Sequence, residues 1–382
     1  MTQKIPSPSS FSRASLVAYS ILIVYASWYP FSGWQFENLA AFFDQLFQWP
    51  KYWGWFDASV NVVGYIPFGV LLVFALYPHL SRKWSVLLAS LAGCATSLLM
   101  ESVQFFLPSR VTSSLDVLTN TAGCMLGAHL GAFLLPWILE NGSLEALKKR
   151  WLRHEAPREI LVLSLWPLAQ IFPQDFLFGL GQIFPVISLW CEEYLGLSID
   201  LNAVLLHGLG LELSAEKYLL SETLVTACGC TGAILICLSL LNRHAPQFVL
   251  ACATLVAALT AKALANALMF QPEDAFSWLT PGAQGGLVIS IIMLYGFSFA
   301  PKQTQRRLAL LLLTISLLLV NLIPSNPYFL NTLQTMMQGK MLNFYGAAQF
   351  LSVTWPFVAI WYLWVKPSSS PPVEFRVKQG QN

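Results

Sequence analysis

A group of polar and charged residues lies within or beside two strongly apolar stretches in the first third of the chain. Its members are Glu101, Gln104, Arg110, Asp116 and Asn120. An ionisable group inside a membrane segment costs about 2.5 kcal/mol or more, and it usually faces a bundle interior or a wet cavity. These residue types predict a working site: carboxylates for acid–base chemistry, a guanidinium for phosphate or carboxylate, and amides for hydrogen bonds.

The composition indicates a chain that is solvated mainly by lipid. Of its 382 residues, 56% are hydrophobic and only 10% are charged, whereas a soluble domain carries about 25% charged residues. The net charge of +2 gives no indication of nucleic-acid binding. The seven Cys have neither zinc nor redox spacing, so we interpret them as small buried hydrophobes and expect no metal and no cofactor.

Ten apolar stretches are each long enough to cross a bilayer as a helix, which takes about 20 residues. They are centred near Ile23, Val70, Cys94, Leu126, Leu168, Cys230, Ala257, Ile291, Leu313 and Thr354. If all ten cross, most of the 21 Lys and Arg residues fall on one side, and the positive-inside rule places that side and both termini in the cytoplasm. The predicted fold class is therefore all-α, a polytopic helical membrane protein with about ten transmembrane helices.

This topology divides the chain into four parts. They are residues 1–140 with four spans, a basic cytoplasmic linker at 141–158, a bundle of about six spans at 159–366, and a disordered cytoplasmic tail at 367–382. On the outer side, residues 36–56 are expected to lie at the headgroup level. Residues 179–217 are expected to form a long outer connection whose apolar piece, residues 201–211, is too short to span.

The predicted topology brings the polar group to one depth. The third span runs outward and the fourth returns, so Glu101 and Asn120 lie at similar depths, about 7 Å below the outer end at 1.5 Å per residue. Asn61 enters the second span at the same level, and Arg110 and Asp116 lie nearer the outer surface. The sequence thus predicts that these polar groups converge just below the outer interface.

A repeat of small residues indicates which way the fourth span faces. Gly123, Gly127 and Gly131 recur at intervals of four residues, a spacing that lets a neighbouring helix approach closely. Asp116 and Asn120 lie on the same stripe by the 3.6-residue period. We therefore expect both side chains to face protein and not lipid.

Three blocks of this region resemble the signature of VanZ-like membrane proteins. They are NVVGYIPFG at 61–69, ESVQFFLPSR at 101–110 and SLDVLTNTAG at 114–123. The resemblance covers about residues 15–140 and implies a multi-pass domain in a bacterial cytoplasmic (inner) membrane. The family's namesake is an accessory protein for resistance to teicoplanin, a glycopeptide that acts on the cell wall, so the resemblance implies a role at the cell envelope.

A second pair of charges lies in the later spans. Glu222 is about one turn into its span, and Lys262 lies about seven residues from the outer end of the next one. A buried pair of these two residues could be a proton or ion relay, or a structural ion pair. His129 and His207 are isolated, which favours packing or solvent contact over metal binding.

The sequence leaves three functions open. The favoured one is an outer-leaflet pocket for a lipid-linked envelope precursor or a glycopeptide, with Arg110 meeting phosphate or carboxylate. In it, Asn61, Gln104 and Asn120 would bond sugar or amide groups. The second is an intramembrane enzyme that uses Glu101 and Asp116 as acid and base, and the third is a transporter.

Each polar residue also has a structural explanation. Glu101 and Arg110 could neutralise each other, Asp116 could cap the fourth helix, and Asn61 and Asn120 could bond across helices. Membrane lipid and the proposed envelope ligand are the expected partners. The oligomeric state is not indicated by the sequence.

Overall fold

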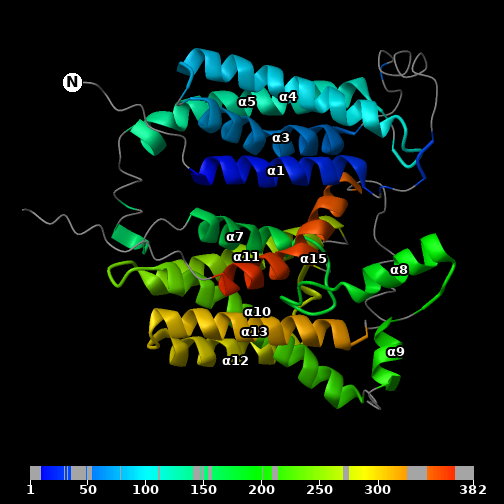
Figure 1. The fold of residues 1–382 in the computed structure, drawn as a ribbon, viewed down its shortest axis with the longest axis vertical. Coiled ribbons are helices and arrows are strands. Elements are labelled where there is room, and N and C mark those ends of the chain that lie inside the picture. Colours follow the sequence, from blue (N-terminus) through cyan, green and yellow to red (C-terminus); the bar gives the residue numbers. More distant parts are fainter. Residues whose placement is uncertain are drawn as a thin grey trace, which may run out of the picture.

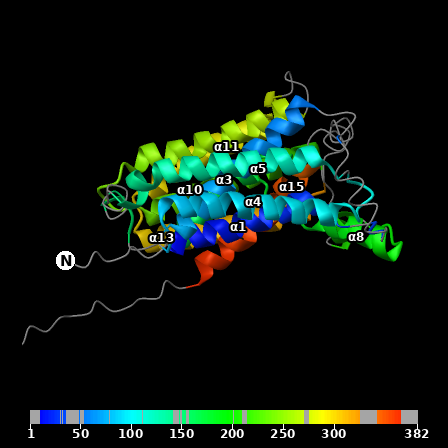
Figure 2. The ribbon, with the colours of Figure 1, turned by 90° about the horizontal axis from the view of Figure 1, so that it is seen from above.

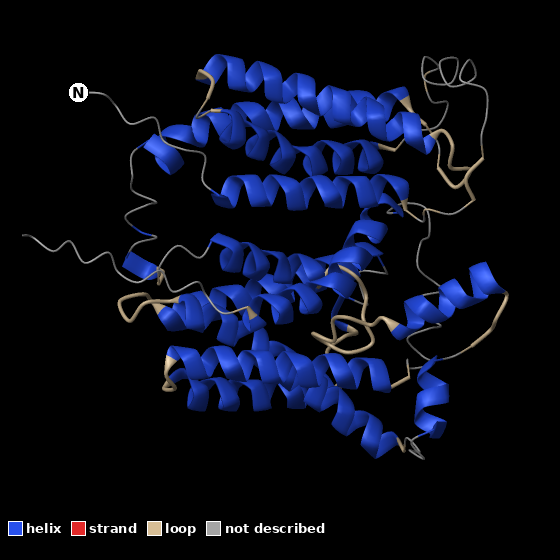
Figure 3. Ribbon diagram, in the orientation of Figure 1, coloured by secondary structure: helices blue, strands red, loops and turns tan. Residues whose placement is uncertain are grey.

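A computed structural model describes residues 10–365, apart from 30, 32, 36–48, 50–53, 78, 111, 141–146, 148–149, 154–156, 200, 209–213, 270–274 and 325–341. The named elements in these residues are all helices, and the β-pairing among them is one isolated bridge, between Leu152 and Leu241 (Figure 3). Most of the expected headgroup segment at 36–56 and all of the expected tail at 367–382 lie outside the described residues. The all-α fold class is confirmed.

The helices fall into an N-terminal and a C-terminal group (Figure 1). The first contains α1 (Ser10–Trp28), α3 (Trp55–Leu76), α4 (Arg82–Gln104), α5 (Ser114–Leu135) and the π-helical turn η1 (Pro136–Glu140). The second contains α7 (Pro157–Ala169), α8 (Phe184–Leu195), α9 (Leu201–Gly208), α10 (Ala215–Leu240), α11 (Gln247–Met269), α12 (Pro281–Ser298), α13 (Lys302–Leu322) and α15 (Leu342–Trp364).

Every predicted span centre falls in a helix. Among the described residues, seven helices are long and apolar enough to cross a membrane: α3, α4, α5, α10, α11, α12 and α13. The other three centres, Ile23, Leu168 and Thr354, lie in α1, α7 and α15. A polytopic membrane protein is therefore confirmed, whereas the count of ten crossings stays a prediction.

Helices α3 and α5 form the tightest pair of the N-terminal group. A methyl group added to Gly127 would overlap the backbone oxygen of Ile66, and one added to Gly123 would overlap that of Val62. Gly69 of α3 meets the backbone oxygen of Cys124 in the same way. The backbones of the two helices touch because these positions carry no side chain, as the glycine spacing predicts.

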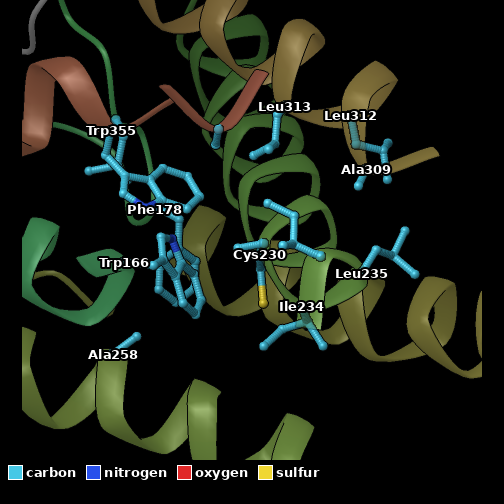
Figure 4. Close-up of a cluster of buried hydrophobic side chains, with 14 of the residues drawn as sticks. Trp166, Phe178, Cys230, Ile234, Leu235, Ala258, Ala309, Leu312, Leu313 and Trp355 are labelled. Atoms are coloured by element: carbon cyan, nitrogen blue, oxygen red, sulfur yellow. The ribbon is translucent and has the colours of Figure 1, made fainter. Parts of the chain in front are cut away.

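The C-terminal group is built around α10. Its apolar window is 83% buried, against 17% for that of α11, so α10 is the central helix. Beside it, the rings of Trp166 and Phe178 lie 5.1 Å apart and those of Trp166 and Trp355 6.3 Å apart (Figure 4). The indole N–H of Trp355 donates to the carbonyl of Val162 at 2.7 Å, which joins α15 to α7.

The chain after α7 is irregular but buried. Phe178 is 2% exposed, and its carbonyl packs against Gly229 near the middle of α10. Backbone groups away from water need internal partners, and here the N–H of Gly181 donates to the carbonyl of Ser352 at 3.0 Å. The outer connection was expected to begin at residue 179. Residues 179–181 are buried within the bundle, and the placement of this connection on the outer side stays a prediction.

Several basic residues gather at one end of the bundle. Lys302 donates to the carbonyl of Leu238, and Arg306 donates to the carbonyls of Tyr362, Leu363 and Val365. Helix α8 lies at the opposite end from the start of α1 (Figures 1 and 2). This arrangement agrees with the charge separation in the sequence; the assignment of the basic end to the cytoplasm stays a prediction.

Candidate functional site

A cavity of about 340 Å³ lies where the two groups of helices meet. Helices α1, α3, α4 and α5 supply its polar residues, and α7, α15 and the residue Ile171 add apolar ones. Five of the six site residues predicted from the sequence line it: Asn61, Glu101, Gln104, Asp116 and Asn120. The volume is at the lower end of the range for ligand pockets, about 300–1,000 Å³.

Glu101 connects the end of α4 to the start of α5. Its Oε2 accepts a hydrogen bond from the backbone N–H of Ser113 at 2.9 Å, and Ser113 is the N-cap residue of α5. A carboxylate is stabilised at a helix N-terminus because the first N–H groups there have no partner within the helix. Glu101 is only 3% exposed, so this bond compensates part of the cost of burying its charge.

Asp116 connects α5 to α3. It lies in the first turn of α5, and its Oδ1 accepts a hydrogen bond from Asn61 Nδ2 at 2.9 Å. Asp57, in the first turn of α3, is close enough for its charge to repel that of Asp116. The interhelical bond expected of the asparagines is thus present at Asn61, and Asp116 lies both in the first turn of α5, where it was expected to cap the helix, and at the cavity.

Asn120 leaves an acceptor at the cavity. Its Nδ2 donates to Ser97 Oγ at 3.0 Å, but its Oδ1 is buried and has no hydrogen-bond partner. The hydroxyl of Tyr65, another lining residue, interacts with Ser97 as well. Both residues are only 7% exposed. A buried polar atom without a partner costs free energy, and a bound molecule or water is a direct way to satisfy it.

Arg110 does not line the cavity. Its Nε donates to the carbonyl of Tyr29 at 2.8 Å and one terminal nitrogen donates to that of Ala26 at 3.0 Å. Gln104 Nε2 donates to the carbonyl of Ser27 at 2.7 Å. Both side chains therefore cap the C-terminal end of α1, whose last carbonyls have no partner within the helix.

The charge of Arg110 suits this capping role. Burial lowers the pKa of its guanidinium to about 10, an effect that interactions with Tyr29 and then Glu101 partly offset. The group therefore remains charged at neutral pH, and a cation is favoured at a helix C-terminus. Arg110 was expected to meet the phosphate or carboxylate of a ligand, but in the structure its guanidinium donates to carbonyls at the C-terminal end of α1.

The expected pair of Glu222 and Lys262 is not formed. The carboxylate of Glu222 accepts a hydrogen bond from the hydroxyl of Thr280, the N-cap residue of α12. Lys262 Nζ donates to the carbonyl of Phe172 at 3.4 Å, just beyond α7, and interacts electrostatically with Asp175. Glu222 and Lys262 therefore have different partners. The positions of the two residues along neighbouring spans do not predict these partners.

Only one of the two isolated histidines, His129, has a described side chain. His129 is exposed and its Nδ1 lies 2.8 Å from the carbonyl of Met125. The side chain of His207 lies outside the described residues. Within the described part of the chain, no group of three or more His, Cys, Asp or Glu residues is placed to hold a metal ion.

The sequence analysis missed the apolar wall of the cavity. Leu168 of α7, Ile171 and Leu351 of α15 line it opposite the polar residues. No local pattern links these positions to the first third of the chain. Tyr65 was also missed, although its place one helical turn after Asn61 puts both on one face of α3.

The fold and the cavity define an all-α polytopic membrane protein with a polar site enclosed by helices. Residues 14–136 match the VanZ/LLP1 family model. The N-terminal part of this protein is therefore a VanZ-like domain, as the three sequence blocks predict. No curated protein and no solved structure matches the chain.

Proposed function

We propose that the VanZ-like domain binds an amphipathic molecule of the bacterial cell envelope, such as a lipid-linked precursor or a glycopeptide, in this cavity. One observation carries the proposal: a single cavity joins the carboxylates of Glu101 and Asp116 to an apolar wall from α7 and α15. A polar end opposite an apolar wall matches a ligand that has a polar head and a hydrocarbon chain. The protein would act in the cytoplasmic membrane, where such molecules are found.

The cavity offers such a ligand a way in from the lipid. Val63 of α3 and Leu168 of α7 both line it, and they are 63% and 41% exposed. Exposed apolar side chains at a cavity rim face the hydrocarbon region in a membrane protein. A chain could therefore enter between α3 and α7 without leaving the bilayer.

In this proposal, two of the C-terminal helices take part in binding the ligand. Helices α7 and α15 contribute wall residues to a cavity whose polar groups all belong to the VanZ-like domain. They would hold the apolar part of the ligand and thereby set which chains fit. Binding would then depend on both groups of helices.

An intramembrane enzyme is the second candidate, because two carboxylates line one cavity. Glu101 bonds a backbone N–H and Asp116 bonds an amide, so they have different environments and could divide acid and base roles. The variant Glu101→Gln separates the two functions. A binding protein keeps part of its affinity in this variant, whereas an acid–base enzyme loses nearly all turnover.

The test compares the lipids that co-purify with three forms of the protein, by native mass spectrometry. Val63→Trp places a bulky ring at the rim of the cavity, whereas Leu118→Trp places the same ring at a 58% exposed position of α5 that does not line it. We expect one class of amphipathic molecule on the wild type and on Leu118→Trp, and its loss from Val63→Trp. Identical lipid profiles in all three forms would contradict the proposal.

A further inference from the structure

The polar end of the cavity holds two carboxyl groups and no lining cation. Glu101 and Asp116 both line it, and Asp57 lies near Asp116. Among the described residues that line the cavity, none is Lys, Arg or His. Arg110 acts electrostatically on Glu101 but does not line the cavity, and two of its nitrogen atoms donate to the carbonyls of Ala26 and Tyr29 at the end of α1. An anionic head group would therefore meet carboxyl groups and no cation here.

Each amide nitrogen of the cavity uses one of its two N–H groups within the protein. Their bonds run from Asn61 to Asp116, from Asn120 to Ser97, and from Gln104 to the carbonyl of Ser27. One amide oxygen, the Oδ1 of Asn120, is buried and has no hydrogen-bond partner. It is an acceptor that a ligand could use. The hydroxyl of Tyr65 can donate or accept.

We propose that the part of the ligand that enters this cavity carries a protonated amine. This inference rests on the proposed function and specifies its ligand. An ammonium group has three donors and no acceptor, which suits two carboxylates and the free oxygen of Asn120. It would also supply the positive charge that a buried pair of carboxylates needs.

The position of the apolar wall indicates that the ligand also has a hydrocarbon chain. Leu168 and Leu351 line the same cavity as the carboxylates, so a hydrocarbon chain attached near the amine has a surface to pack against. The exposed rim at Val63 lets a longer chain continue into the bilayer. The ligand is thus an amphipathic amine, whether the amine belongs to a lipid head group or to a larger envelope molecule.

The experiment uses three probes with one chain and different heads: dodecylamine, dodecanol and dodecyl phosphate. Each is added at the same mole fraction to the full-length protein in detergent, and bound probe is counted by native mass spectrometry. The variants are Val63→Trp, the double variant Glu101→Gln/Asp116→Asn, and Glu192→Gln as a control, since Glu192 is an exposed carboxylate on α8. Both isosteric replacements keep the acceptors that Ser113 and Asn61 use.

We expect dodecylamine to bind wild type and Glu192→Gln about tenfold or more tightly than dodecyl phosphate, and to lose that preference in the double variant. If the double variant does not fold, the single variant Asp116→Asn decides in its place. Equal or tighter binding of dodecanol or dodecyl phosphate to wild type, or unchanged amine binding in the isosteric variant, would overturn the inference. If Val63→Trp does not change the binding of any of the three probes, the proposed function is overturned instead.

Discussion

At the scale of residues, several ionisable side chains in or beside the apolar stretches form hydrogen bonds at the ends of helices. Arg110 caps α1, Glu101 bonds the start of α5, and Glu222 bonds the N-cap residue of α12. Lys262 bonds a carbonyl just beyond α7. Helix ends leave N–H and C=O groups without partners, and lipid cannot supply any. A charge in an apolar stretch is therefore insufficient evidence of a site, and it is the cavity that distinguishes Glu101 and Asp116.

The identity of these residues was predictable, but their partners were not. Polar residues in apolar stretches are visible in the sequence, and helical spacing placed Glu101 and Asn120 at one depth. Side-chain direction in the loop after α4 is not set by any period. Arg110 therefore could not be assigned to the end of α1 in advance.

Replacing Arg110 tests its capping role. In Arg110→Gln the carbonyls of Ala26 and Tyr29 lose charged donors, and we expect a loss of stability of about 1.5–3 kcal/mol, with binding of dodecylamine unchanged. Thermal unfolding in detergent and the native mass spectrometry assay measure the two effects. Arg307→Gln, at an exposed position of α13, should leave both unchanged. A selective loss of ligand with normal stability would show that Arg110 acts in binding.

At the scale of elements, the close approach of a neighbouring helix to α5 was predictable because its cause is local, but the identity of that neighbour was not. The four-residue glycine spacing marks a face that admits another backbone, and the structure places α3 against it. The buried, irregular segment after α7 was not predictable, because its apolar residues are typical of a membrane-spanning helix. Its conformation depends on distant partners such as Ser352 and Asn321.

Gly127→Ala tests the close contact. The new methyl group would overlap the backbone oxygen of Ile66, and overpacking of this kind costs about 1–3 kcal/mol. Gly64→Ala is the matched control, because a methyl group there meets nothing within 4 Å, and alanine favours helix over glycine. We expect a lower unfolding temperature for the first variant and an equal or higher one for the second. Equal unfolding temperatures would refute the packing argument.

A double-mutant cycle tests the end of α7. Lys262 is 1% exposed, and Lys262→Met removes both its electrostatic interaction with Asp175 and its hydrogen bond to the carbonyl of Phe172, so we expect a loss of stability of about 1–3 kcal/mol. The loss from Asp175→Asn should be much smaller when Lys262 is already Met than in the wild type. Additive losses, measured by thermal unfolding, would mean that the two residues do not interact.

At the scale of the whole molecule, the two groups of helices share one cavity. The sequence alone predicted the spans, because each depends on its own composition, and it predicted a basic side from the distribution of Lys and Arg. It could not predict that α7 and α15 would border the VanZ-like domain. That contact joins residues more than 100 positions apart and depends on how separate helices fit together.

Cysteine labelling tests the orientation of the whole molecule. Ser198 follows α8, Gln303 lies at the start of α13, and both are exposed. The native cysteines lie within helices, and only Cys252 is exposed, so wild type provides a low baseline for an impermeant thiol reagent. Because the positive-inside rule places the basic end in the cytoplasm, Ser198→Cys should react in intact cells and Gln303→Cys only after permeabilisation. The reverse pattern would show the opposite orientation in the membrane. The polar end of the cavity would then face the cytoplasmic leaflet, where no envelope molecule on the outer face could reach it.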